Sequence, residues 1–312
     1  MSAPRFDVIG IGGCAWDLLG RVARYPHPGE KVPLLEFREQ GGGQAASAVV
    51  SVARLGGRTA FVGTVGDDAA GANICREFEA EGVDTSHLFL DPQGTSHLAF
   101  CAVLDASGER AIFFTPGSKR RLQPADLDPE FLCSAGCLLL DTHHPEAHVA
   151  AAALARQAGI PVVTDLEHAV CCIEELLRLG THPVLPERFL LEHTGETDGE
   201  RAAIRLLERY QPRALVVTRG VRGSIGYQDD EVYHQPAYQV DRVVDTTGAG
   251  DVFHGAFAYG LVLGYDLPTN LEFASLVAGL KCRRLGGRSG LPTREELKEL
   301  WRLPLPEAPL LQ

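Results

Sequence analysis

The sequence lacks any long apolar run. No stretch of about 18 uninterrupted apolar residues occurs, so we expect no membrane-spanning helix. The N-terminal segment MSAPRFDVIGIGG has no basic region followed by a long apolar segment, which argues against a secretory signal peptide. We therefore expect a cytoplasmic protein with no membrane partner.

Positive charge is scarce. The chain has 29 Lys and Arg residues against 41 Asp and Glu residues, which gives a net charge of −12. A nucleic-acid partner needs clustered positive charge, so the composition argues against one. It does not argue against ATP, because backbone N–H groups and a metal ion can neutralise the phosphates of a nucleotide.

Three common motifs are also missing. The eight cysteines include no C-x-x-C pair, so we interpret them as reduced and mostly buried thiols. No Walker loop of the form G-x-x-x-x-G-K-[ST] occurs. Gly10, Gly12 and Ala15 approximate a dinucleotide-binding fingerprint, but Pro26 and Pro28 argue against the helix that this motif requires. Hydride transfer is therefore disfavoured, and a kinase would need another phosphate-binding loop.

Strand and helix patterns alternate along most of the 312 residues. The segment RFDVIGIGG reads as a buried strand and QAASAVVSVARLG as the helix after it, and the same alternation continues to RALVVT. Such alternation predicts an α/β fold with a central, mostly parallel sheet flanked by helices. We expect one such domain over residues 1–312, with ligands at the carboxyl ends of its strands.

Two segments interrupt the alternation. Residues 14–40 contain several prolines and short alternating runs, and residues 95–115 read as a hairpin with a turn at 106–108. We expect these segments to form a small antiparallel sheet that projects from the core.

Residues 245–251, Asp-Thr-Thr-Gly-Ala-Gly-Asp, are the most informative motif. They precede a long apolar run, VFHGAFAYGLVLG, that predicts a helix. Gly248, Ala249 and Gly250 would let backbone N–H groups at the helix N-terminus approach an anion closely. Asp251 would place a base beside that anion. This combination is typical of phosphoryl transfer to a hydroxyl, although a capped Gly-rich loop would have the same pattern.

The stretch DTTGAGDVFHGA resembles the C-terminal signature of the ribokinase-like (PfkB) family of carbohydrate kinases. GGGQAASAVVSVARLGG at 41–57 approximates the N-terminal signature. GIGGCAWD, VGDDAAG, TRGVRG and VAGLKCRRLGG follow the family's order, and VVDTTGAGD with VAGLKC is closest to the ketohexokinase-like branch. The resemblance implies the ribokinase-like fold, with the two interrupting segments as a lid over the sugar that often mediates dimerisation.

The resemblance also implies roles for individual residues. Asp251 matches the catalytic base, and Gly248, Ala249 and Gly250 match the anion hole. Asp17 matches a carboxylate that binds sugar hydroxyls, and Gly41 and Gly42 match paired glycines beneath the sugar. Two further sets of residues match ligand-binding positions of the family. The nucleotide-binding positions are matched by Thr218, Gly220, Gly223 and Cys282. The positions that bind a monovalent cation such as K⁺ are matched by Asp245, Thr247, Arg284, Gly286 and Gly290.

Two departures from the family pattern affect the interpretation. Gly43 and Ala46 stand where an Asn usually contacts the sugar, and Glu187-Arg188-Phe189-Leu190 stands where an N-x-x-E motif usually organises Mg²⁺. Asp165 and Glu167, at the end of a predicted strand, are the carboxylates that could replace that motif for Mg²⁺.

The sequence thus predicts an ATP-dependent kinase that phosphorylates a primary hydroxyl of a ketose or related furanose, and that forms a homodimer through the lid. A nucleoside kinase and a non-catalytic nucleotide or sugar sensor remain alternatives. An anionic sugar is a further alternative, because Lys119, Arg120 and Arg121 follow the lid hairpin.

Overall fold

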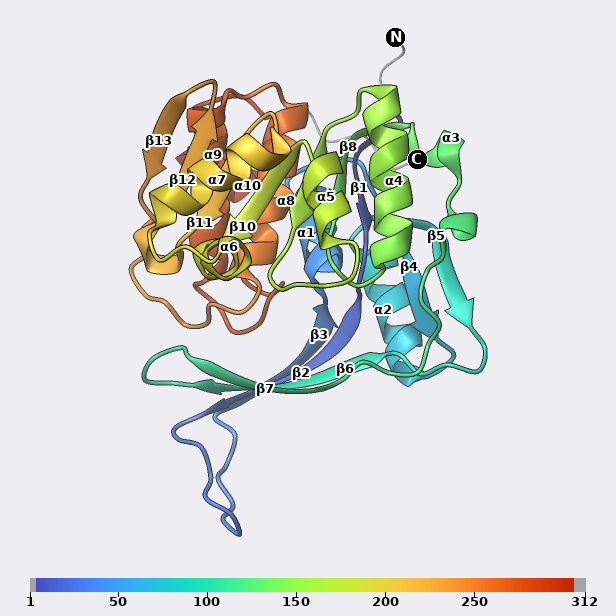
Figure 1. Cartoon of the computed structure of the whole chain (residues 1–312). Helices are drawn as coiled ribbons and strands as arrows, with labels where there is room; N and C mark the ends of the chain where they lie inside the picture. The colour runs from blue at the N-terminus through green and yellow to red at the C-terminus, as the bar shows by residue number, and fades with distance from the viewer. Residues whose placement is uncertain (1–3, 306–312) are drawn as a thin grey trace.

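A nine-stranded sheet runs through the centre of the molecule, and a four-stranded sheet projects from one end of it (Figure 1). The computed structural model describes residues 4–305, so the outermost residues of the expected domain lie outside the described part. The order of the large sheet is β13-β12-β11-β10-β9-β8-β1-β4-β5. Its strands are β1 (Phe6–Ile11), β4 (Thr59–Gly66), β5 (Asp84–Asp91), β8 (Ala135–Leu140), β9 (Val162–Asp165), β10 (His182–Pro186), β11 (Leu215–Thr218), β12 (Ser224–Gln228) and β13 (Glu231–Gln235).

Every neighbouring pair between β11 and β5 is parallel, and only the pairs β11–β12 and β12–β13 at one edge are antiparallel. The mostly parallel sheet predicted from the alternating pattern is therefore confirmed. The antiparallel edge forms because β11, β12 and β13 follow one another through short turns, without a crossover helix between them.

Helices cover both faces of this sheet (Figure 1). Successive strand residues pack into different cores: Val8 and Leu139 contact the core that includes α1 and α8, whereas Ile9 and Leu138 contact the core beneath α4. Burial on both faces explains why these strands read as continuous apolar runs. The helices are α1 (Gln44–Arg54), α2 (Ala69–Ala80), α3 (Pro129–Leu132), α4 (Pro145–Ala158), α5 (Ile173–Leu179), α6 (Glu187–Thr194), α7 (Gly199–Tyr210), α8 (Ala249–Val262), α9 (Leu267–Lys281) and α10 (Arg294–Leu300), with short 3₁₀ turns η1 (Pro124–Asp126) and η2 (Gly220–Arg222).

The small sheet consists of the two segments that interrupt the alternation. Its order is β3-β2-β6-β7, with β2 (Ala15–Val22), β3 (Glu36–Gly42), β6 (His97–Leu104) and β7 (Arg110–Thr115). Both hairpins, β2–β3 and β6–β7, are antiparallel as expected, but β2 and β6 pair in parallel. The parallel junction arises because β2 and β6 continue from β1 and β5, which run in the same direction within the large sheet. We call this sheet the lid.

The lid lies at the carboxyl ends of the parallel strands, where α8 also begins (Figure 1). Segments that follow β1, β8, β9 and β11 therefore meet near the N-terminus of α8. No helix within residues 4–305 is long and apolar enough to cross a membrane.

Candidate active site at the N-terminus of helix α8

Helix α8 begins with three small residues and then a carboxylate. Gly248 is the N-cap, with a left-handed φ of 73°, and a side chain there would be strained and crowded against Gly287. No atom lies within 4 Å of the point that a β-carbon of Gly250 would occupy. The N–H of Ala249 donates to the carbonyl of Thr246 at 3.2 Å, so an anion at this turn would be bound by the N–H groups of Gly248, Gly250 and Asp251.

Asp251 lies in this first turn and is partly buried. Burial raises the pKa of its carboxyl to about 7, and the negative charges of Glu167 and Asp17 act in the same direction, while Arg110 and Lys281 lower it. A carboxyl with a pKa near neutrality can take a proton from a hydroxyl and later release it at physiological pH. The geometry therefore suits Asp251 to the role of a general base.

A second carboxyl, Asp165, ends β9 close to Asp251. It is 1% exposed and neither of its carboxyl oxygens has a hydrogen-bond partner. Burial, followed by the charges of Glu167 and Asp251, raises the pKa of Asp165 well above its usual value. Its Oδ1 lies 3.4 Å from Nε2 of His254, whose ring bridges the carbonyl oxygens of Gly250 and Val184 at 2.7 and 2.9 Å.

The donor set near Asp165 fits Mg²⁺ only in part. Glu167 is exposed two residues beyond Asp165, and the unpartnered oxygens of Asp165 are groups that a cation would satisfy. However, no group of three or more His, Cys, Asp or Glu side chains is arranged to hold a metal within residues 4–305. Mg²⁺ commonly binds through one or two carboxylates together with substrate phosphates and water, and this set is compatible with that mode.

The segment 187–190, which stands in place of the N-x-x-E motif, lacks the final carboxylate of that motif. Leu190 is fully buried in the core beneath α6, so it faces away from solvent and has no polar atom to offer. Glu187, at the start of α6, pairs with Arg222. Neither residue supplies a free carboxylate at the Asp165 end of the sheet.

The predicted sugar-binding residues lie together on the lid. Asp17 on β2 is 9% exposed, and a β-carbon on Gly42 would overlap its carboxylate, so only glycine fits there. Burial raises the pKa of Asp17 to about 6; Glu77 also raises it, while Arg288 lowers it. Among the described residues no hydrogen bond to this carboxylate is recorded, which leaves its oxygens available to a ligand.

The sequence interpretation missed the two charged residues that hold the Gly41–Gly42 segment in place. Glu77 on α2 accepts a hydrogen bond from the backbone N–H of Gly41. Arg288 is 1% exposed, donates to the carbonyl of Gly42 at 3.1 Å and lies 3.4 Å from Glu77. A side chain at Gly41 would overlap both. The second glycine-rich run, LGGRSG, was the available signal for Arg288.

Arg110 was also missed. It begins β7, and its Nη1 lies 3.3 Å from the hydroxyl of Thr246, directly before the anion-binding turn. The lid thus contributes a guanidinium on the α8 side of the site.

Asp141 and His143 follow β8, and the buried carboxylate of Asp141 pairs with the half-buried imidazole of His143. The carboxylate accepts hydrogen bonds from the backbone N–H groups of Gly13 and His143 at 2.7 and 2.8 Å, and Nδ1 of His143 lies 3.3 Å away. Asp141 raises the pKa of His143. The His143 ring packs against Gly13 and lies 6.4 Å from the ring of His97 on the lid, so this imidazole lies beside the sugar-binding residues.

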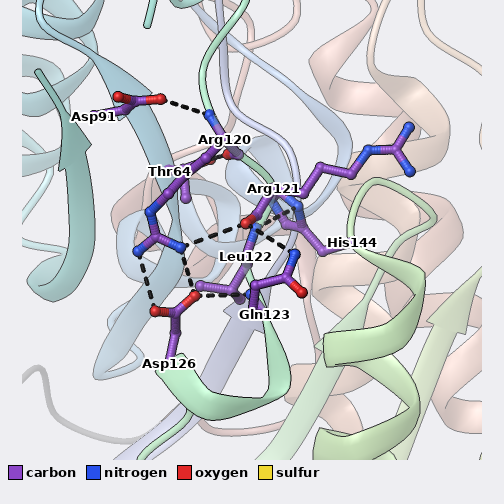
Figure 2. A network of polar contacts seen from close by, with 8 residues as sticks. All are labelled: Thr64, Asp91, Arg120, Arg121, Leu122, Gln123, Asp126 and His144. Carbon is purple, nitrogen blue, oxygen red and sulfur yellow. Dashed lines mark hydrogen bonds and ion pairs between the residues drawn. The ribbon is translucent and has the colours of Figure 1, made fainter. Parts of the chain in front are cut away.

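The basic residues that follow the lid hairpin, at 119–121, are only partly engaged in ion pairs. Figure 2 shows the Arg120 guanidinium turned toward Asp126, which it binds at 2.6 Å, while its backbone N–H donates to Asp91. Arg121 is exposed and extends away from this network. Lys119 is half-buried, and neither Lys119 nor Arg121 makes an ion pair with a carboxylate within the described residues, so both remain available to an anion.

The residues expected on the nucleotide side lie at the end of β11 and in the turn after it. Gly220 and Gly223 have positive φ values of 57° and 84°, and a β-carbon on Gly223 would overlap the carbonyl of Gln235. The turn itself thus explains these glycines, and the role of Thr218 in nucleotide binding stays a prediction. Cys282 is the C-cap of α9, and its carbonyl accepts hydrogen bonds from the N–H groups of Val244 and Asp245 rather than facing this turn.

The structure brings together three of the five residues expected to bind a monovalent cation. The buried carboxylate of Asp245 accepts hydrogen bonds from the backbone N–H and hydroxyl of Thr247 at 2.8 and 2.7 Å and from the N–H of Gly286 at 2.7 Å. The Arg284 side chain is exposed, and Gly290 packs against the carbonyl of Lys281.

Comparison with known proteins identifies the family. The profile of the pfkB family carbohydrate kinases matches residues 6–294. This chain belongs to the pfkB family of carbohydrate kinases. Its relatives are sugar kinases, so the predicted enzyme class and fold are confirmed.

Three relatives illustrate the similarity of this carbohydrate kinase. It is 31% identical to a ribokinase of Bacillus subtilis, over 93% of this chain and 97% of the relative. It is 29% identical to a 5-dehydro-2-deoxygluconokinase of Shouchella clausii, over 96% of each chain. The structure of Arabidopsis thaliana ribokinase complexed with ribose and ATP superposes with a TM-score of 0.82 at 25% identity, over 97% of this chain and all of that one. The ketohexokinase-like branch stays a prediction.

Proposed function

We propose that this protein transfers the γ-phosphoryl group of ATP to a primary hydroxyl of a sugar, with Asp251 as general base. The observation that carries the proposal is the position of Asp251: a partly buried carboxyl with a pKa of about 7 in the first turn of α8, beside three residues without bulky side chains. Asp251 takes the hydroxyl proton as the new O–P bond forms, and ADP leaves. The N–H groups of Gly248, Gly250 and Asp251 stabilise the transferred group, and the small side chain of Ala249 leaves room for it.

The sugar binds between the lid and α8 in this proposal. Asp17 accepts hydrogen bonds from sugar hydroxyls, and Gly41 and Gly42 let the sugar approach the backbone. Arg288 and Glu77 hold that segment in place without touching the sugar. The relative from Arabidopsis thaliana, whose structure contains ribose and ATP, supports this combination of ligands.

ATP binds on the other side of α8, next to Thr218, Gly220 and Gly223. Mg²⁺ would be held by the nucleotide phosphates with Asp165 and Glu167, and when bound it neutralises charge on the phosphates. The chain's own contribution at this end is to orient: the two ring nitrogens of His254 lie 2.7 and 2.9 Å from the carbonyl oxygens of Gly250 and Val184, so this ring positions the first turn of α8 beside β10.

A ketose or related furanose is the first candidate substrate, and a sugar acid is the second. The second is favoured by His143, whose pKa is raised by Asp141 and whose ring lies beside the sugar-binding residues, and by the ammonium of Lys119, which makes no ion pair within the described residues. The relative from Shouchella clausii is named for a gluconate-type substrate. A carboxylate on the sugar would give these two groups a partner.

We further propose that the protein is a homodimer that associates through the lid. Strand β7 lies at the edge of the lid and exposes Ile112, Phe113 and Phe114, and the other edge exposes Leu35 and Phe37. Exposed apolar side chains on edge strands mark an interface.

The test is ADP formation with Mg-ATP across a panel of aldoses, ketoses, aldonates and nucleosides. Turnover of sugars, with the strongest response to a ketose, furanose or sugar acid, is the expected result. Preferred turnover of a nucleoside would replace the sugar assignment. Binding of sugar and ATP without any turnover would indicate a sensor and would contradict the proposed chemistry.

A further inference from the structure

A fully buried lysine lies behind the anion-binding turn. Lys281 is the last residue of α9, its side chain is 0% exposed, and its Nζ donates to the backbone carbonyl of Asp245 at 2.9 Å. Removing an ammonium group from water is costly, and lysine is rarely buried without a partner. The burial of the Lys281 ammonium therefore needs a structural or functional explanation.

The groups around Lys281 are those expected to bind a monovalent cation. Asp245 begins the segment that leads into Gly248, and its two carboxylate oxygens are already occupied by N–H and hydroxyl donors of Thr247 and Gly286. Its carbonyl oxygen is occupied by Lys281. The chain's own donors thus satisfy the oxygens of Asp245, and a K⁺ ion would have to displace an ammonium that carries the same charge. These residues do not fit a bound cation.

The contacts of Lys281 reach the site through one short segment. The carbonyl of Cys282, the next residue, accepts hydrogen bonds from the N–H groups of Val244 and Asp245 at 2.8 and 3.3 Å. The end of α9 therefore holds residues 244–245 through a backbone pair and a charged hydrogen bond. Since Gly248 follows three residues later, this attachment fixes where the N–H groups of the α8 N-terminus point.

We propose that the Lys281 ammonium takes the place of a bound monovalent cation, so that the anion-binding turn of this kinase is ordered without K⁺. An ammonium group carries one positive charge and offers N–H donors to oxygen atoms, which is what a monovalent cation supplies at such oxygens. Lys281 acts as a positioning residue, since it contacts Asp245 and not the reacting groups. Burial lowers the pKa of Lys281, whereas the carboxylates of Asp245 and Asp251 raise it and favour the charged form; the ammonium in turn lowers the pKa of Asp251. The inference rests on the proposed role of residues 248–251.

The first experiment uses the unmodified protein. Melting temperature and kcat are measured in K⁺, Na⁺, NH₄⁺ and tetramethylammonium salts at constant ionic strength. We expect kcat to vary by less than about twofold and the melting temperature to be the same in all four. Stimulation by K⁺ of several-fold, or stabilisation by K⁺ alone, would overturn the proposal.

The second experiment separates charge from space. Lys281→Ala removes the charge and leaves room for an ion, whereas Lys281→Met removes the charge and fills the room. We expect both to lose at least tenfold in kcat in tetramethylammonium, and only Lys281→Ala to recover with K⁺ or NH₄⁺. Lys298→Met, on the exposed face of α10, is the matched control and should behave as the wild type.

Other outcomes are equally decisive. A Lys281→Ala protein that is impaired but unresponsive to every cation would assign Lys281 a packing role and overturn the proposal, as would one that is fully active. If neither variant folds, the cation response of the wild type still decides. The melting temperatures can be measured without turnover, so they test the role of Lys281 even if the protein phosphorylates no sugar. Absence of turnover would count against the proposed function and not against the role of Lys281.

Discussion

Asp251 combines a partly buried carboxyl with the N-terminus of a helix. As a general base it is expected to contribute roughly 10²–10⁴-fold to the rate. We predict that Asp251→Asn lowers kcat by about that factor while the affinity for ATP, measured by calorimetry, stays within a few-fold of wild type. Activity close to wild type would remove Asp251 from the chemistry.

The raised pKa of Asp251 also affects stability. An unfolded Asp titrates near 3.9, whereas the folded carboxyl titrates at about 7. Between these values the folded state holds a proton that the unfolded chain has released, so this group makes the protein less stable as the pH rises through that window. Asp251→Asn should therefore raise the melting temperature at pH 8 and raise it less at pH 5. An equal change at both values in calorimetry would contradict the assignment.

Asp17 should carry much of the sugar recognition, because Gly43 and Ala46 offer no side-chain hydrogen bonds. Hydrogen bonds to a charged group are worth about 1.5–3 kcal/mol each. We predict that Asp17→Ala raises the KM for the sugar at least tenfold, or abolishes turnover, while ATP binding without sugar is near normal. The opposite pattern, with weakened ATP binding and intact sugar affinity, would place the substrate on the other side of α8.

The loop after β9 is the element that tests the metal assignment. Glu167 is exposed there, and the usual acidic position is occupied by Leu190 in the core. We predict that Glu167→Gln raises the Mg²⁺ concentration needed for half-maximal rate without changing the melting temperature. Glu187→Gln, on α6 and paired with Arg222, is the comparison variant and should leave the Mg²⁺ dependence unchanged. Indifference of the Glu167 variant would mean that ATP and water alone hold the ion.

The elements themselves could largely be predicted from the sequence, and the buried charges could not. The strands, the helices and the 245–251 turn are local patterns of apolar spacing, glycine and helix capping, which is why they were found. Glu77, Asp141, Lys281 and Arg288 reach the site from distant segments. Since charged residues are seldom buried, nothing in the sequence distinguishes these four from charged residues on the surface.

The molecule as a whole is expected to be a dimer because of its lid. Phe113 is 66% exposed on the edge strand β7, where an apolar ring favours association. We predict that Phe113→Asp shifts the protein from dimer to monomer in sedimentation velocity at micromolar concentration. Ile204→Asp, at an exposed apolar position on α7, is the control and should leave the dimer intact. A wild-type protein that sediments as a monomer would refute the proposed interface.

The parallel pairing of β2 with β6 has a consequence for how the chain acquires activity. The two strands are far apart in sequence, and their pairing joins hairpins that leave the large sheet from β1 and β5. Contacts between distant segments form slowly because a long loop must close first. During refolding, helical circular dichroism should therefore recover before catalytic turnover does. The substrate site would then mature after the helices, together with other long-range strand pairs such as β1 with β8.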